Sequence, residues 1–112
     1  DWFGLESRPV GVLFSSEVLL IPLFGHTLGH CGVAIQQGSK WLLHVGDSYY
    51  LREELTMDDH PVSSIAAQRA DDDAQRQASL AHLRRLMRDH GEEVEMIGYH
   101  DLKELPDNYP LP

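Results

Sequence analysis

Four short, mainly apolar runs separated by polar turn sequences limit what this chain can fold into. The runs are Val10–Phe14, Val18–Leu23, Gly32–Ile35 and Trp41–Val45. Their length and their Val, Ile and Leu content are typical of β-strands, and "SSE" and "QQGSK" are turn signals. The apolar residues are nearly continuous rather than alternating, which is typical of strands buried on both sides. We therefore expect an antiparallel sheet with both faces covered.

The second half of the chain carries one strong helical pattern. The sequence "DDDAQRQASLAHLRRLMRDHG" contains an apolar stripe near helical spacing. Its members are Ala74, Ala78, Leu80, Leu83, Leu86 and Met87. Acidic residues at its start and arginines near its end suit the helix dipole. The pattern predicts a helix over 73–90, preceded by a shorter one in "VSSIAAQRA" and followed by a strand over 94–97.

These elements predict one domain over residues 1–112, of mixed α/β (α+β) class, with mainly antiparallel strands and one long helix. Residues 102–112 are rich in proline and predict a surface tail. With 18 acidic and 9 basic residues the net charge is −9, which disfavours binding to nucleic acid. No apolar run is long enough to span a membrane. The single cysteine, Cys31, allows no intrachain disulfide and fits a reducing, cytoplasmic compartment.

The stretch "LIPLFGHTLGHCGVAI", residues 20–35, combines two histidines with three glycines. His26 and His30 stand four apart, a spacing that would place both on one face of a helix, as in helical zinc sites. However, each glycine inside a helix costs about 1 kcal/mol relative to alanine. We therefore favour a loop that follows a strand, with the helical zinc site as the alternative.

Ligand-type residues follow three of the predicted strands, each near a glycine. They are His26 after Gly25, Asp47 after Gly46, and His100 two residues after Gly98. Side chains at strand ends can converge on one rim of a layered α/β structure, where sites commonly form. Imidazole and carboxylate groups suit zinc, iron or manganese. The sequence thus predicts a metal site whose ligands are far apart in the chain.

In this order, "GHTLGH", "LLHVGDSYY" and "IGYHD" resemble the second half of the metallo-β-lactamase fold superfamily. The resemblance covers residues 18–101 and implies the C-terminal half of an αββα sandwich. It implies that His26 binds the first metal, that Asp47 bridges two metals, and that His100 binds the second. It also implies that His30 orients its neighbours. Tyr50 lies where lactonase-like members carry a tyrosine that hydrogen-bonds the substrate carbonyl, and could equally be a rim aromatic without a catalytic part.

One motif of that superfamily is missing. Its first metal motif, His-x-His-x-Asp-His, belongs to the first half of the fold and does not occur in this chain. Catalytic zinc normally has three protein ligands, so the chain holds only part of the implied dinuclear centre. We therefore expect the chain alone to be inactive.

The resemblance implies the C-terminal portion of a metal-dependent hydrolase that uses zinc, or iron or manganese. Its substrate would be a small-molecule ester, thioester, lactone or amide, attacked by a metal-activated hydroxide. The alternative is a non-catalytic half-domain or fragment that folds by association. Because one helix can cover only one sheet face, we expect that the chain is not a free monomer. Either a missing N-terminal half covers the other face, or a homodimer partner does so in an oligomer.

Overall fold

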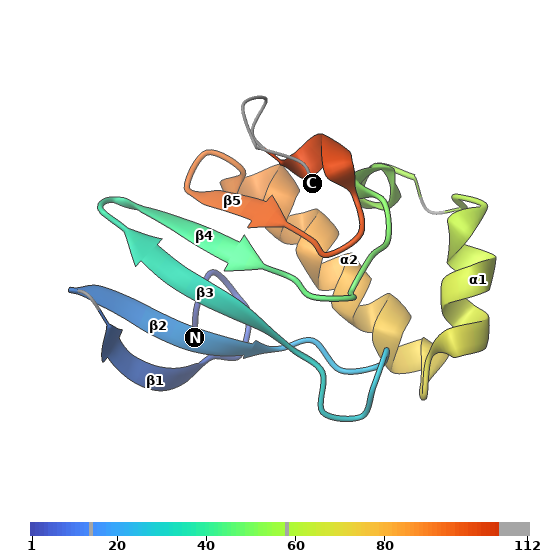
Figure 1. The fold of residues 1–112 in the computed structure, drawn as a ribbon, viewed down its shortest axis with the longest axis horizontal. Coiled ribbons are helices and arrows are strands. Elements are labelled where there is room, and N and C mark those ends of the chain that lie inside the picture. The colour runs from blue at the N-terminus through green and yellow to red at the C-terminus, as the bar shows by residue number, and fades with distance from the viewer. Residues whose placement is uncertain (14, 58, 106–112) are drawn as a thin grey trace, which may run out of the picture.

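The computed structural model describes residues 1–13, 15–57 and 59–105, and its elements follow the predicted pattern (Figure 1). Five strands form one sheet in the order β1–β2–β3–β4–β5. Their bounds are Arg8–Leu13, Ser16–Pro22, Cys31–Gln37, Lys40–His44 and Val94–Ile97. Strands β1 to β4 pair antiparallel, whereas β5 pairs parallel with β4. The parallel pairing is possible because the helices between β4 and β5 return the chain to the same end of the sheet.

Two α-helices and two 3₁₀-helices complete the described part of the chain. Helix α1 is Val62–Arg69, helix α2 is Asp73–His90, and the 3₁₀-helices η1 and η2 are Arg52–Leu55 and Leu102–Glu104. Helix α2 begins at its N-cap Asp72, whose side chain accepts a hydrogen bond from the Gln75 backbone nitrogen at 3.1 Å. The mixed α/β class with one long helix is therefore confirmed. Among the described residues, no helix is both long and apolar enough to cross a membrane.

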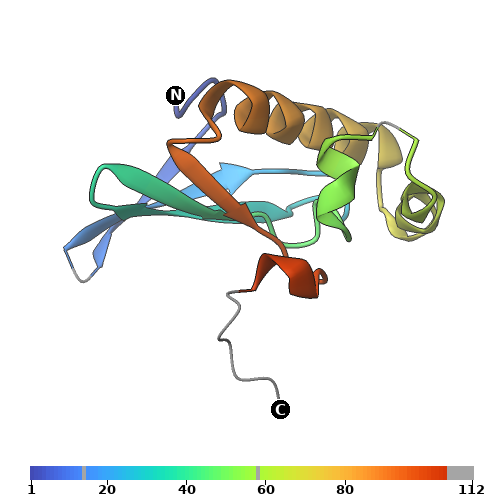
Figure 2. The same ribbon diagram turned by 90° about the horizontal axis from the view of Figure 1, so that it is seen from above.

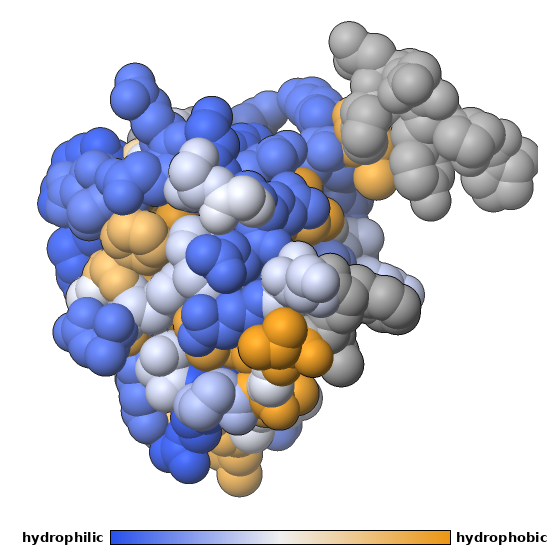
Figure 3. Space-filling view, turned by 90° about the vertical axis from the view of Figure 1, so that its left-hand side faces the viewer, coloured by the Kyte–Doolittle hydropathy of each residue, from blue (hydrophilic) through white to orange (hydrophobic). Residues whose placement is uncertain are grey.

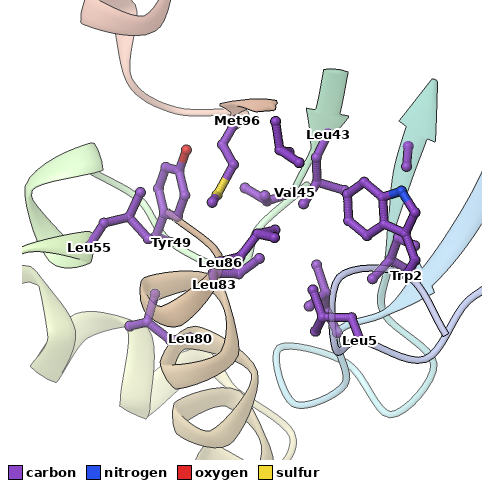
Figure 4. Close-up of a cluster of buried hydrophobic side chains, with 14 of the residues drawn as sticks. Trp2, Leu5, Leu43, Val45, Tyr49, Leu55, Leu80, Leu83, Leu86 and Met96 are labelled. Carbon is purple, nitrogen blue, oxygen red and sulfur yellow. The ribbon is translucent and has the colours of Figure 1, made fainter. Parts of the chain in front are cut away.

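Helix α2 lies across one face of the sheet (Figure 2). The pairing register aligns Leu19, Ala34, Leu43 and Met96 in a row across β2 to β5, and all four are buried. Side chains from α2 meet this row in the hydrophobic core (Figure 4). They are Leu80, Leu83 and Leu86. The core therefore lies between α2 and the sheet.

The predicted apolar stripe of α2 is only partly the buried stripe. Ala74 and Ala78 are exposed, whereas Arg76 between them is buried. Gly25 packs so closely on the backbone of Arg76 that a Cβ added to it would lie 2.0 Å from the Arg76 nitrogen. The first turns of α2 are thus covered by the loop after β2 rather than by the sheet.

The face of the sheet opposite α2 is also apolar. The next row of the register contains Leu20, Val33, His44 and Ile97, which are half-buried or exposed. No α-helix of the described residues packs on this face (Figure 2), so the expectation of two covered faces is not met within the described chain. Val10 and Val12 of β1 are 55% and 70% exposed, and hydrophobic surface is visible at the β1–β2 end of the sheet (Figure 3).

Part of the segment assigned to the proline-rich tail is folded. Residues 102–104 form η2, and the side chain of Glu104 is only 1% exposed. The remaining tail residues, 106–112, lie outside the described part of the chain, as does Phe14 at the end of the first predicted strand.

Candidate metal centre

Strand direction brings the three predicted ligands to one edge of the sheet. Strands β2 and β4 run the same way because both are antiparallel to β3, and β5 is parallel to β4. Their C-terminal ends therefore lie at the same edge (Figure 1). His26, Asp47 and His100 each lie in the segment that follows one of these strands.

The side chains of these three residues meet around the carboxylate of Asp47. Its Oδ1 lies 2.7 Å from His100 Nε2, and its Oδ2 lies 3.6 Å from His26 Nε2. The predicted convergence at one rim is confirmed. Each carboxylate oxygen faces a different imidazole, an arrangement that suits a carboxylate shared between two cations.

His30 lies next to this group and fixes the turn that carries Asp47. Its Nδ1 is 2.8 Å from the Leu23 carbonyl oxygen, and its Nε2 accepts a hydrogen bond from the Asp47 backbone nitrogen at 2.9 Å. These partners place the ring proton on Nδ1. The imidazole therefore connects the loop after β2 to the turn after β4.

Close contacts require a glycine both in the loop after β2, where Gly25 packs on Arg76, and in the turn after β4, at Gly46. Gly46 has φ +60°, and a Cβ there would lie 2.6 Å from His30 Nε2.

Residues 25–30 form bends and a turn rather than a helix. His26 and His30 therefore do not form the helical zinc site, and that alternative is wrong.

The site is open to solvent and lies beside an aromatic ring. The side chains of His26, Asp47 and His100 are 22%, 32% and 44% exposed. The ring of Tyr50 lies 4.9 Å from that of His100, in an edge-on arrangement. A small molecule that reaches Asp47 could therefore also contact Tyr50.

The residues present fit a metal centre in their donor chemistry. Two imidazoles and one carboxylate are typical ligands of zinc, iron and manganese. His26 Nδ1 is buried and has no hydrogen-bond partner among the described residues. Within residues 1–13, 15–57 and 59–105, however, no three His, Cys, Asp or Glu side chains form a group that could by itself hold a metal ion. The arrangement is instead two His–Asp pairs that share Asp47.

A polar cluster next to the site was not found by sequence reasoning. The phenol of Tyr49 donates a hydrogen bond to the buried carboxylate of Glu104, which also accepts one from Arg52. Burial, together with this hydrogen bond and the negative charge of Glu104, raises the pKa of Tyr49 far above its ordinary value. Tyr49 is therefore a neutral donor at all ordinary pH values. No local pattern marks these residues, because each finds its partner in a distant segment.

No protein-family model matches the chain. Probable metallo-hydrolases from Mycobacterium bovis and Mycobacterium tuberculosis are each 41% identical to it over 54 residues. The match covers 48% of this chain and 17% of each relative. The chain therefore spans only a small part of these curated relatives.

Solved structures decide the fold. An N-acyl homoserine lactone hydrolase, with the product N-hexanoyl-L-homoserine bound at its catalytic metal centre, superimposes with a TM-score of 0.59 and 20% identity. The match covers 86% of this chain and 34% of that one. This chain has the metallo-β-lactamase fold. A quorum-quenching N-acyl homoserine lactone lactonase gives a TM-score of 0.57 at 20% identity, over 78% of this chain and 33% of its own. The shared part of the metallo-β-lactamase fold is thus about a third of the lactonase chains.

Proposed function

We propose that this chain is the C-terminal portion of a metal-dependent hydrolase that acts on small-molecule esters or lactones, with thioesters and amides as chemically related substrates. The observation that carries the proposal is the carboxylate of Asp47, whose two oxygens face His26 and His100 from three different strand ends. The fold and the names of the curated relatives support it. Bound metal ions would lower the pKa of a water molecule, so that hydroxide is available near neutral pH.

In this proposal the residues of the chain have separate tasks. Asp47 would be shared by two ions, while His26 and His100 would each bind one of them. His30 keeps the Asp47 backbone in place through its 2.9 Å hydrogen bond. Zinc, iron or manganese would suit this donor set, and further ligands would have to come from outside the chain.

Tyr50 would provide specificity for a carbonyl substrate. Its ring lies next to His100 and is half-buried. A phenol in this place could donate a hydrogen bond to the carbonyl oxygen as negative charge develops on it, a contribution typically worth about 100-fold or more in rate. The lactone ring of a lactonase substrate offers such a carbonyl.

Hydrolysis of a panel of small esters and lactones by the full-length natural protein tests the proposal. We expect activity to disappear after chelation and to return with added zinc, iron or manganese. Asp47→Asn should lower the activity at least about 100-fold, since even residues that merely support metal ligands cost 10- to 100-fold. Asp89→Asn, at an exposed ion pair on α2, is the matched control and should leave the hydrolytic activity unchanged. Activity that survives both chelation and Asp47→Asn would refute the proposal.

The open apolar face of the sheet favours a second candidate, a non-catalytic half-domain or fragment that folds by association. Leu20 and its neighbours across β3 and β5 present this face to solvent. Soluble monomers rarely leave a large apolar patch uncovered. The partner would be either an N-terminal half of the same fold or a second copy of the chain. If the protein is such a non-catalytic half-domain, the hydrolase assay would remain negative although the chain is folded.

A further inference from the structure

Glu104 is a buried carboxylate at the end of η2, close to the candidate metal centre. Its side chain is 1% exposed. Oε1 accepts a hydrogen bond from the Gly98 backbone nitrogen at 2.7 Å, while Oε2 accepts one from Tyr49 Oη and one from Arg52 Nη1, the latter at 2.9 Å. Each oxygen therefore faces donors. A buried charge of this kind is retained only where its hydrogen bonds are satisfied.

Hydrogen bonds to Glu104 and to the Arg52 backbone hold the turn that carries His100 at its two ends. Gly98, at the start of the turn, binds Glu104. Asp101, at its end, accepts a hydrogen bond from the Arg52 backbone nitrogen at 2.9 Å. A Cβ at Gly98 would lie 2.9 Å from Tyr49 Cε1 and 3.2 Å from Glu104 Oε1, so the turn packs directly on this cluster.

The same hydrogen bonds reach the segment that carries Asp47. Tyr49 follows Asp47 by two residues, and Arg52 lies at the start of η1. Arg52 Nη1 also donates to the Met96 carbonyl oxygen of β5 at 2.7 Å. Glu104 thus connects the two segments whose ligand side chains, Asp47 and His100, meet at 2.7 Å.

We infer that Glu104 is a positioning residue that sets the placement of His100 relative to Asp47 and thereby the affinity for metal. This inference rests on the proposed function, since it assumes that both side chains bind metal. The carboxylate suits the task because both of its oxygens accept hydrogen bonds. The amide of glutamine would have to turn its NH₂ group toward either the Gly98 N–H or the Arg52 guanidinium, both of which can only donate.

Metal titration of the full-length natural protein tests this inference. Zinc affinity is measured by competition with a chromophoric chelator, and the coordination is followed by the absorption spectrum of the cobalt-substituted protein. Glu104→Gln should weaken zinc binding by about 10- to 100-fold, the usual effect of residues that orient metal ligands, and should alter the cobalt spectrum. Glu53→Gln is the matched control because Glu53 is half-exposed in the adjacent η1, and its carboxylate pairs with the exposed Lys103 and with His60 rather than with Gly98, Tyr49 or Arg52.

Tyr49→Phe provides a second variant that removes only one hydroxyl from the cluster. It should weaken zinc binding in the same direction but by less, because Arg52 and Gly98 still hold Glu104. If the unaltered protein binds metal and both variants bind it equally well, the positioning role is wrong while the proposed function stands. If the unaltered protein binds no metal, the proposed function fails and this inference fails with it.

Discussion

Replacement of His30 by alanine tests whether its imidazole stabilises the two segments that form the candidate site. His30 joins two segments through its hydrogen bonds to the Leu23 carbonyl oxygen at 2.8 Å and from the Asp47 backbone nitrogen at 2.9 Å. Alanine can form neither of them. The buried Leu23 carbonyl and the half-buried Asp47 amide would then lose their partner.

The expected loss follows from these two hydrogen bonds. Each contributes about 1 kcal/mol net, and an unsatisfied buried partner can add about 1 kcal/mol more. His30→Ala should therefore lower the free energy of unfolding by about 2–3 kcal/mol. With a urea m-value of about 2 kcal/mol/M, the unfolding midpoint should fall by roughly 1–1.5 M.

Urea unfolding followed by tryptophan fluorescence measures this change. Trp2 and Trp41 pack edge to face with ring centroids 5.6 Å apart, so their emission reports on the core. His82→Ala is the control, because His82 is exposed on α2 and its ring forms a hydrogen bond to Arg85 of the same helix rather than joining two segments. That variant should stay within about 0.5 kcal/mol of the unaltered protein. If His30→Ala were as stable as His82→Ala, the bridging role of His30 would be refuted.

Three further predictions concern charge, metal binding and association. Burial raises the pKa of the Asp73 carboxyl, but hydrogen bonds from Arg76 and Gln77 and the charge of Arg76 together hold it below its ordinary value. The stability it contributes is fully present above about pH 4 and is lost as the pH falls through its lowered pKa, so Asp73→Asn should destabilise at pH 7 and differ less from the unaltered protein as the pH falls below about 4 in urea unfolding. The 112-residue chain alone should retain little metal on dialysis, because two or three ligands are divided between two centres; stoichiometric metal in elemental analysis would contradict this. The isolated chain should also associate at micromolar concentration in sedimentation equilibrium, since its sheet has an open apolar face, and a well-folded monomer would show that this face needs no cover.

The sequence predicted the elements whose pattern is local. The bounds of β5 and α2 agree with the predicted ranges 94–97 and 73–90, because the spacing of apolar residues reflects burial along a single element. Strand direction then explains why His26, Asp47 and His100 meet, which the order of motifs had indicated. The first result depends on the repeated spacing of apolar residues, and the second on the order of the three motifs along the chain.

Features that depend on one distant contact could not be predicted in this way. Arg76 is buried inside an otherwise apolar pattern because Gly25 packs on its backbone and Asp73 and Ser63 bind its guanidinium. Glu104 lies in a segment that composition assigned to a surface tail. Its burial depends on Tyr49 and Gly98, and no periodicity connects these positions.

Crystallography of the zinc-loaded full-length protein, with anomalous diffraction recorded at the zinc edge, tests the central claim most directly. We expect two anomalous peaks beside the carboxylate of Asp47, one about 2.0–2.1 Å from a ring nitrogen of His26 and the other at the same distance from a ring nitrogen of His100. Zinc bound elsewhere, with Asp47 still hydrogen-bonded directly to His100, would contradict it.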